Sequence, residues 1–254
     1  MRRFFDFRES RDEAKPFMAH LEDLRSTLIK MSAALAATMM LCFLFRTELA
    51  AVIQHPLALV DPERAANLQS LGVADSFTIS LELAFYGGFV LAFPFLLLFL
   101  AEFVLPALNP AEKRLLYPAA LLGFGLFLGG VAFSYLVVLP QTLTFFFNDA
   151  RSMNWQPTWT VREYYSFTTQ FVIAFGLAFE LPLVVLILVK LGLVDFALLR
   201  RTRAFAIVVI FVFAAIITPT SDILTLVLMG APMYVLYEIC IGISWLMERR
   251  SRGE

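Results

Sequence analysis

Residues 77–101 read FTISLELAFYGGFVLAFPFLLLFLA, and Glu82 is the one charged side chain in this run. A helix needs about 20 apolar residues to cross a hydrocarbon layer roughly 30 Å thick. The run reaches that length without a second charge. It therefore predicts a membrane-spanning helix.

Composition extends this conclusion to the whole chain of 254 residues. Hydrophobic residues make up 60% of it and charged residues 16%, whereas soluble domains average roughly 45–50% and 25%. Too little polar surface remains to cover a soluble core. The formal net charge of −1 offers no basic field to nucleic-acid phosphates. We expect one integral membrane domain over residues 1–254, all-α and without a nucleic-acid partner.

Similar apolar runs recur along the chain and predict a polytopic protein with six transmembrane helices. The fifth run is the shortest, and a buried or re-entrant segment is an alternative for it. The expected spans are about 26–45, 77–101, 117–139, 166–189, 204–217 and 223–247.

The distribution of Lys and Arg favours all six spans. With six, sixteen of the 20 basic residues lie on the side of the two chain ends. Cytoplasmic loops are enriched in Lys and Arg, so both termini are expected in the cytoplasm. Without the fifth span, the C-terminal arginines would move to the opposite side and weaken this bias. The four basic residues expected outside are Arg46, Arg64, Arg151 and Arg162.

Residue types that support catalysis or metal binding are scarce. Cys42 and Cys240 lie in separate apolar runs without C-x-x-C spacing, and the two histidines are His20 and His55. This pattern predicts no metal site, redox site or cofactor. The sequence also contains no phosphate-binding glycine loop and no nucleophile–base motif. We expect a protein that is not an enzyme and draws its energy from the transmembrane potential.

The segment before the first span predicts a short amphipathic helix on the cytoplasmic interface. Its apolar stripe, at i, i+4, i+7 and i+11, consists of Phe17, Leu21, Leu24 and Leu28. Glu22 and Arg25 share one flank at a spacing that allows an ion pair. Asp23 lies on the other flank with His20 and Thr27. Two interpretations remain open: a solvated face of a docking helix, or a carboxylate that receives a cation from a partner.

Glu112 is a second candidate acid on the same expected face of the membrane. It follows a turn stiffened by Pro106 and Pro110, and it precedes Lys113 and Arg114. A local ion pair of small value is one interpretation. In the other, Glu112 and Asp23 together favour a dicationic ligand, with bidentate guanidinium geometry as the strongest case.

Glu180 is expected near the middle of the fourth span, where a carboxylate is costly and faces a partner, an interior or a wet cavity. Pro182 leaves the carbonyl of Ala178 without its helical donor. A protonated Glu180 bonded to a neighbouring helix is the structural interpretation. A proton-coupled transporter of a small molecule is the functional alternative, although such transporters usually contain repeats that this sequence lacks.

Four motifs in order, together with six spans, resemble the TatC family, the large membrane component of twin-arginine protein export. The resemblance extends from about Phe17 to Glu248. The motifs are His20-Leu21-x-x-Leu24-Arg25, Phe103-Val104-Leu105-Pro106-Ala107-Leu108 followed by Glu112-Lys113-Arg114, Phe175–Pro182, and Thr218-Pro219…Asp222…Ala231-Pro232-Met233-Tyr234…Tyr237-Glu238.

The resemblance implies a receptor for signal peptides with consecutive arginines, on cargo that crosses the membrane folded. By position, Asp23 and Glu112 match the family's two arginine-contacting acids and Phe103 matches the nearby aromatic residue, with Glu22 and Arg25 beside Asp23. The family usually has Glu where Asp23 stands, so this carboxylate reaches less far and Glu22 is placed to share its role.

For the membrane-embedded part, the resemblance implies that Glu180, followed by Pro182, is a polar position on the concave membrane face. It also implies single-span partners of the TatA and TatB types, contact with membrane lipid, self-association in the complex, and drive by the proton-motive force without a nucleotide. The charged first 25 residues show no targeting peptide, which favours a bacterial cytoplasmic membrane.

Overall fold

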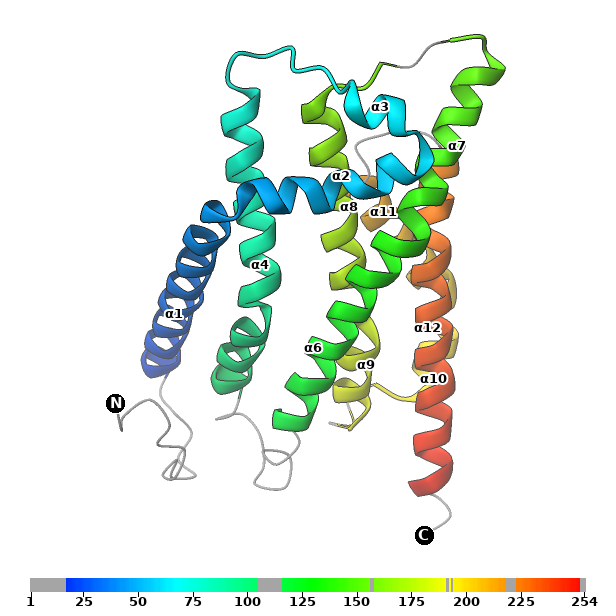
Figure 1. The fold of residues 1–254 in the computed structure, drawn as a ribbon. Helices are drawn as coiled ribbons and strands as arrows, with labels where there is room; N and C mark the ends of the chain where they lie inside the picture. The colour runs from blue at the N-terminus through cyan, green and yellow to red at the C-terminus, as the bar shows by residue number, and fades with distance from the viewer. Residues whose placement is uncertain are drawn as a thin grey trace.

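The computed structural model describes residues 17–104, 116–155, 158–190, 192, 194–217 and 223–251, and in these ranges it is all-α, with one isolated bridge between Gln69 and Thr160 (Figure 1). The helices stand roughly side by side and form a polytopic membrane fold. The elements are α1 Phe17–Leu44, α2 Arg46–Val60, α3 Pro62–Ala66, α4 Asp75–Val104, α6 Leu116–Phe133, η2 Ser134–Val138, α7 Leu139–Ser152, α8 Val161–Ala178, α9 Leu181–Lys190, α10 Phe196–Arg201, α11 Arg203–Ile217 and α12 Ile223–Ser251.

Five helical segments of the described chain are long and apolar enough to cross a membrane, and a shorter apolar helix spans Arg203–Ile216. The short helix matches the expected fifth span. At 1.5 Å per residue, a helix of this length covers only about 22 Å. The long segments are Leu21–Leu44, Asp75–Phe103, Tyr117–Ser152, Val161–Lys190 and Leu226–Arg249.

The expected interfacial helix is helical, and it continues without a break into the first span as the start of α1. Its apolar stripe points away from the other helices, since Leu21 is 42% exposed and Leu28 is 54% exposed. Thr27, on the opposite flank, is buried. The stripe is therefore available to lipid while the polar flank faces the bundle.

The third span is longer than predicted, because Pro140 does not end it. The five residues of η2 form a π-helical turn, and Pro140 follows in the first turn of α7. A proline ring clashes with the carbonyl four residues earlier, and a single wider π turn inside a helix changes the backbone path at such a point. The helix that begins the third span consequently continues through α7 to Ser152, past the expected end of the span at residue 139.

The fourth span is interrupted where a continuous helix was expected. After α8 the amide of Glu180 bonds to the carbonyl of Leu177 at 3.1 Å, a tighter i−3 contact, and α9 begins at Leu181. Pro182 has no amide hydrogen to donate to Ala178. The missing donor explains why the helix breaks at this point.

The long segment after the first span contains α2, which lies across the upright helices (Figure 1). Pro56 lies inside α2 and cannot donate to the carbonyl of Val52. The hydroxyl of Tyr135 donates to that carbonyl at 2.6 Å instead. Tyr164 and Tyr165 donate to the carbonyls of Ile53 and Ala50, at 2.7 and 3.2 Å. These three bonds hold α2 against the ends of the spans.

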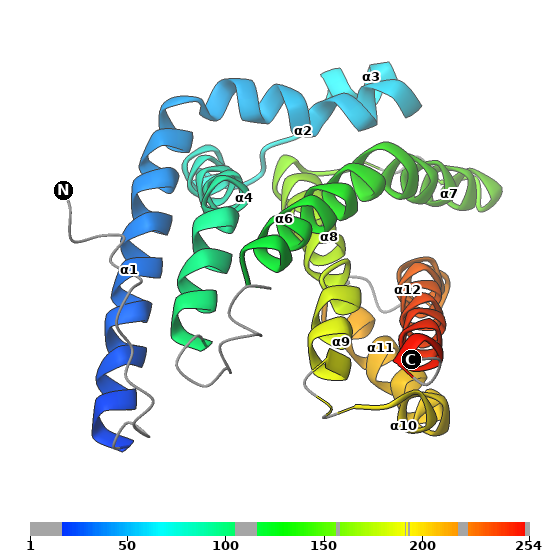
Figure 2. The same cartoon turned by 90° about the horizontal axis from the view of Figure 1, so that it is seen from below.

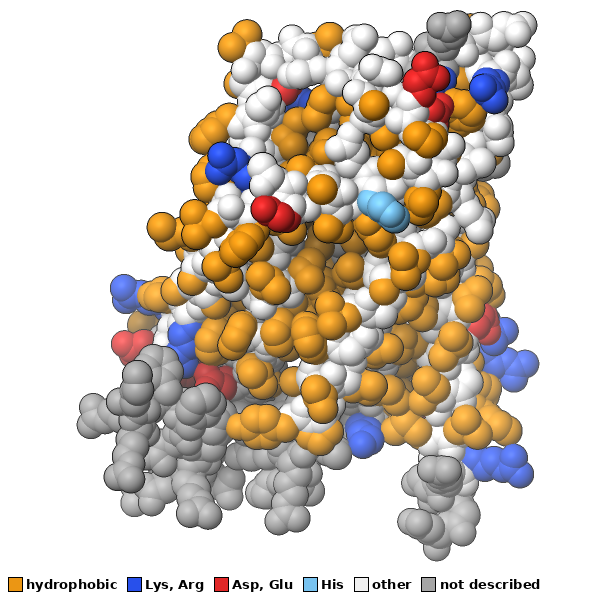
Figure 3. All heavy atoms as spheres, viewed as in Figure 1, with side chains coloured by type: hydrophobic (Ala, Val, Ile, Leu, Met, Phe, Trp, Pro, Cys, Tyr) orange, Lys and Arg blue, Asp and Glu red, His pale blue; other side chains and the backbone are white. Residues whose placement is uncertain are grey.

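The view from below places α1 and α4 at one side, α10, α11 and α12 at the other, and α6 and α8 between them (Figure 2). Apolar side chains cover most of the face in Figure 3, with charged groups above and below an apolar band. An apolar cavity of about 610 Å³ lies between α1, α2, α4, α6 and α8. Residues that line it include Cys42, Leu83, Tyr86 and Leu128.

Candidate functional site

The start of α1 and the end of α4 meet at the lower end of the molecule (Figure 1). Lys30 of α1 donates to Glu102 of α4, with 2.9 Å between Nζ and Oε2. The same Nζ lies 5.9 Å from the centre of the Phe99 ring. This ion pair shows which faces of the two helices oppose one another at this end.

Asp23 shares the α4-facing side of α1. It precedes Thr27 by four residues and Lys30 by seven, which places the three on one helical face. Thr27 is buried and Asp23 is half-buried, whereas Glu22 and Arg25 are exposed. In the part of the chain described, Glu22 and Arg25 form no ion pair, although their spacing allows one. Asp23 therefore faces the neighbouring helix, and the other two side chains face outward.

Phe103 directly follows Glu102 and is half-buried near the end of α4. The structure thus brings the Asp23 face of α1 to the helix end that carries Phe103. Glu112, Lys113 and Arg114 lie outside the described residues, as does the Thr218–Asp222 part of the last motif.

Glu180 lies at the α8–α9 break, against α6. The contact in α6 is Gly123. A Cβ atom added to Gly123 would lie 3.0 Å from Oε2 of Glu180 and 2.7 Å from the Leu183 side chain, so only glycine fits at this position without a shift. The other carboxylate oxygen of Glu180, Oε1, is buried and has no hydrogen-bond partner among the described residues. The structural interpretation of Glu180 expects a hydrogen bond from its carboxyl group to a neighbouring helix. Among the described residues, Oε1 makes no such bond.

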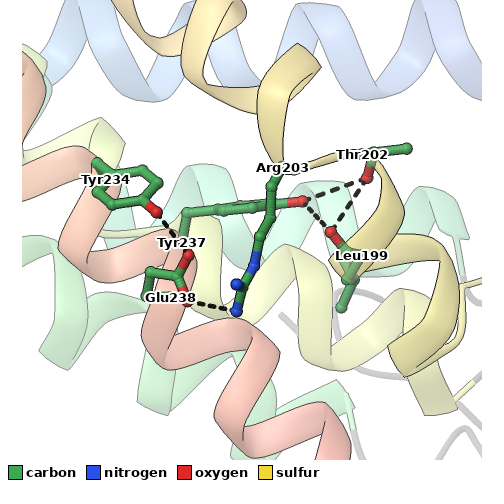
Figure 4. Close-up of polar contacts among 6 residues, drawn as sticks. All are labelled: Leu199, Thr202, Arg203, Tyr234, Tyr237 and Glu238. Atoms are coloured by element: carbon green, nitrogen blue, oxygen red, sulfur yellow. Dashed lines mark hydrogen bonds and ion pairs between the residues drawn. The ribbon is translucent and has the colours of Figure 1, made fainter.

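A polar network between α11 and α12 was not predicted from the sequence (Figure 4). Arg203 pairs with Glu238 at 2.8 Å, and Tyr234 donates to the other oxygen of Glu238 at 2.7 Å. Tyr237 donates to the carbonyl of Leu199 at 2.8 Å. The i, i+4 spacing of Tyr234 and Glu238 was the available signal. These contacts give Glu238 a structural role between the two helices.

Glu82, the one charged residue of the second span, accepts a hydrogen bond from Ser166 at 2.7 Å. No cluster of three His, Cys, Asp or Glu side chains that could hold a metal ion occurs in the described ranges. On the opposite side of the membrane fold, Thr47 donates to exposed Glu48 at 2.8 Å, which lowers the pKa of that carboxyl.

Fold and site together define an all-α polytopic membrane protein. Polar side chains lie where α1 meets α4 at one end, and the short fifth span is paired with α12 through Arg203 and Glu238. The family model described as Sec-independent protein translocase protein (TatC) matches residues 19–232. The chain therefore belongs to the TatC family, and the resemblance read from its motifs is confirmed.

Curated relatives agree with this assignment. The Sec-independent protein translocase protein TatC of Akkermansia muciniphila is 47% identical over 69% of this chain, which spans only 51% of that relative's length. The protein of the same name from Deinococcus radiodurans is 35% identical over 90% of this chain and 85% of its own. A solved structure described as the twin arginine translocase receptor TatC has a TM-score of 0.81 and 34% identity, covering 89% of this chain and 98% of the other.

Proposed function

We propose that this chain is the receptor and core scaffold subunit of a twin-arginine translocase, exporting folded proteins with the proton-motive force. The observation that supports this most directly is the junction of α1 and α4, where half-buried Asp23 faces the helix end carrying Phe103. The receptor name belongs to the solved relative. The small-molecule transporter based on Glu180 is not favoured by the family assignment.

The proposed ligand is a signal peptide with consecutive arginines. A guanidinium group presents a planar fork of donors that matches a carboxylate, and such pairs are among the stronger hydrogen bonds in proteins. Asp23 supplies one carboxylate and Glu112 the second, with Phe103 as the aromatic neighbour. Glu22 and Arg25, exposed beside Asp23, contact the flanking residues of the peptide.

The proposed orientation places this junction in the cytoplasm of a bacterium. The described chain begins with α1 and ends with α12 at the same end of the fold (Figure 1). Exposed basic side chains on helices that terminate there include Lys190, Arg200, Arg201 and Arg249. This bias matches the cytoplasmic side of multi-pass proteins.

The proposed partners are single-span subunits of the TatA and TatB types, a second copy of the chain, and lipid. Glu180 at the α8–α9 break, with buried Oε1 lacking a partner among the described residues, is the polar group that such a subunit would contact within the membrane. Pro182 maintains the break at which this carboxyl group lies.

The test is photo-crosslinking of a twin-arginine signal peptide to the full chain in membranes. We expect Asp23→Ala and Glu112→Ala each to weaken capture by roughly tenfold, as one charge-assisted contact is lost. Glu48→Ala, which removes an exposed acid on the opposite side, is the control. Wild-type capture by the Asp23→Ala, Glu112→Ala double variant would refute the proposed site.

Orientation has a separate test. Single cysteines introduced at Ser251 and Ser70 report the two sides, because native Cys42 and Cys240 are buried. A membrane-impermeant maleimide added to intact cells should label the cysteine at position 70 only. Labelling at position 251 would place the proposed arginine site on the wrong side.

A further inference from the structure

The apolar cavity of about 610 Å³ has a closed back and an open side. Cys42, Leu83 and Val172 line it and are buried, whereas Leu91 and Leu136 line it and are 48% and 68% exposed. Both exposed residues belong to segments that are apolar enough to cross a membrane. The cavity therefore opens sideways, toward the lipid that surrounds the helices.

The lining offers almost nothing to water. No charged side chain lines the cavity in the part of the chain that the structure describes. Two of its hydroxyl groups are already engaged, because Tyr135 donates to the carbonyl of Val52 and Thr169 donates to that of Tyr165. A buried water needs about two to four polar partners, and apolar cavities stay dry or bind apolar molecules. In a membrane, the apolar molecule at hand is a lipid chain.

The dimensions of the cavity suit such a chain. Its volume is that of a small-molecule site, roughly 300–1,000 Å³, whereas a helix with its side chains is about 10–12 Å across. On α4 the lining extends from Leu83 to Leu91, which is roughly 12 Å along the helix axis. The cavity is thus elongated in the direction in which acyl chains lie between membrane helices.

A basic side chain lies at the rim of the cavity. Arg46 begins α2 and shares one helical face with Leu49 and Ile53, at i, i+3 and i+7, and both of these residues line the cavity. The guanidinium group of Arg46 lies 5.1 Å from the centre of the Phe43 ring, and Phe43 directly follows the lining residue Cys42. Arg46 is exposed and has no acidic partner among the described residues. It is therefore available to an anion from the membrane.

We propose that this cavity binds one acyl chain of an anionic phospholipid, whose phosphate group pairs with Arg46. The fork of donors on a guanidinium group matches a phosphate, and basic side chains near the membrane surface attract anionic lipids. A chain gains little by leaving the bilayer for the cavity, because lipid tails are as apolar as the lining. The charge of the headgroup therefore decides which lipid is retained. This site is independent of the proposed arginine site, which lies at the other end of α1.

The test uses the full chain in nanodiscs and two phospholipids with a photoreactive diazirine midway along one acyl chain, one with a glycerol and one with an ethanolamine headgroup. A bound chain should label Val172 and Ile173, which line the cavity but are buried from the surrounding lipid. The phosphatidylglycerol probe should label them more strongly. In Arg46→Gln this preference should fall by about fivefold, the scale of one basic side chain near an anionic lipid. Arg151→Gln is the matched control, because Arg151 is also exposed and stacks on a phenylalanine ring but lies on α7, outside the lining.

A second variant closes the cavity itself. Ala132 lines the open side and is exposed, so a larger side chain at this position fills the opening without entering the packed core. Ala132→Phe should abolish labelling of Val172 by both probes and leave the unfolding midpoint unchanged. Ala215→Phe, at an exposed alanine of α11 that does not line the cavity, should leave the labelling as in the wild type.

Three results would overturn the proposal. They are equal labelling of Val172 by both headgroups in the wild type, an unchanged preference in Arg46→Gln, and undiminished labelling in Ala132→Phe. A parallel reaction carries a photoreactive signal peptide in place of the lipid probes. If that peptide labels Val172 and the lipid probes do not, the cavity is a peptide site and the lipid assignment is wrong.

Discussion

Each side of the bundle contains a pair between a basic side chain and a glutamate, but the two pairs differ in their surroundings. On the α1–α4 side, Lys30 contacts one oxygen of Glu102, and the other oxygen accepts no hydrogen bond among the described residues. On the α11–α12 side, both oxygens of Glu238 are occupied, by Arg203 and by Tyr234 (Figure 4). The first carboxylate can exchange its partner, and the second cannot without losing a network.

The helices on the two sides are also held together differently. Gly88 of α4 lies against the backbone of Met39 in α1, where an added Cβ would lie 2.7 Å from the Met39 nitrogen. Close approach of backbones at small residues is a common source of stability between membrane helices. On the other side, Tyr237, Thr202 and Leu199 extend the polar contacts of α12 to α10.

This difference explains how an ion pair beside a binding site can be exchangeable. Because steric packing at Gly88 holds α1 on α4, the Lys30–Glu102 pair is not needed to keep the helices together. The helix α11 is shorter than a full membrane span, and the pair between Arg203 and Glu238 adds a polar contact between it and α12. The comparison predicts a different response to substitution on each side.

The largest expected effect comes from Gly88→Ala. The new methyl group meets backbone atoms of α1, which cannot rotate away, so α1 must move. Overpacking of this kind costs about 1–3 kcal/mol in the free energy of unfolding. Thermal unfolding in detergent should show a clearly lowered midpoint. Gly242→Ala in α12, where a Cβ meets nothing within 4 Å, is the control, and an equal loss in both variants would contradict steric packing as the α1–α4 contact.

The second expected effect separates the two glutamates. Glu238→Ala removes the acceptor of both Arg203 and Tyr234 and should cost about 1–2 kcal/mol, the scale of hydrogen bonds to a charged group. Glu102→Ala should cost less than about 1 kcal/mol, because the two pairs are about equally exposed and Glu102 lacks a second donor such as Tyr234 among the described residues. Unfolding midpoints of both variants, measured side by side, test the order. A larger loss in Glu102→Ala would reverse the roles assigned to the two pairs.

Much of the fold could be predicted because apolar run length and the distribution of basic residues depend on local sequence. The first, second and sixth spans needed no other information. The π turn before Pro140 and the break at Glu180 could not be predicted with the same certainty. A proline in a run either ends a helix or distorts it, and neighbouring helices decide which.

The candidate site was predictable in part for the same reason. Helical spacing placed Asp23 and Thr27 on one flank of α1, and the structure agrees. It could not reveal that this flank faces α4, or that Glu102 rather than another acid meets Lys30, because those contacts join residues far apart in the chain. The roles of Asp23 and Glu112 in peptide binding remain predictions.

The smallest expected effect comes from Tyr234→Phe, which would make Glu238 resemble Glu102. Removal of the hydroxyl leaves Oε1 of Glu238 without its 2.7 Å donor, while the pair with Arg203 stays. Interhelical and local polar contacts in membranes average about 0.6 kcal/mol, so the unfolding midpoint should fall slightly. The informative measurement is a double-mutant cycle with Arg203→Gln. If Tyr234 and Arg203 stabilise one shared carboxylate, the two losses should be less than additive. Full additivity would mean that the two contacts are independent, and Glu238 would then be no more committed to its partners than Glu102 is to Lys30.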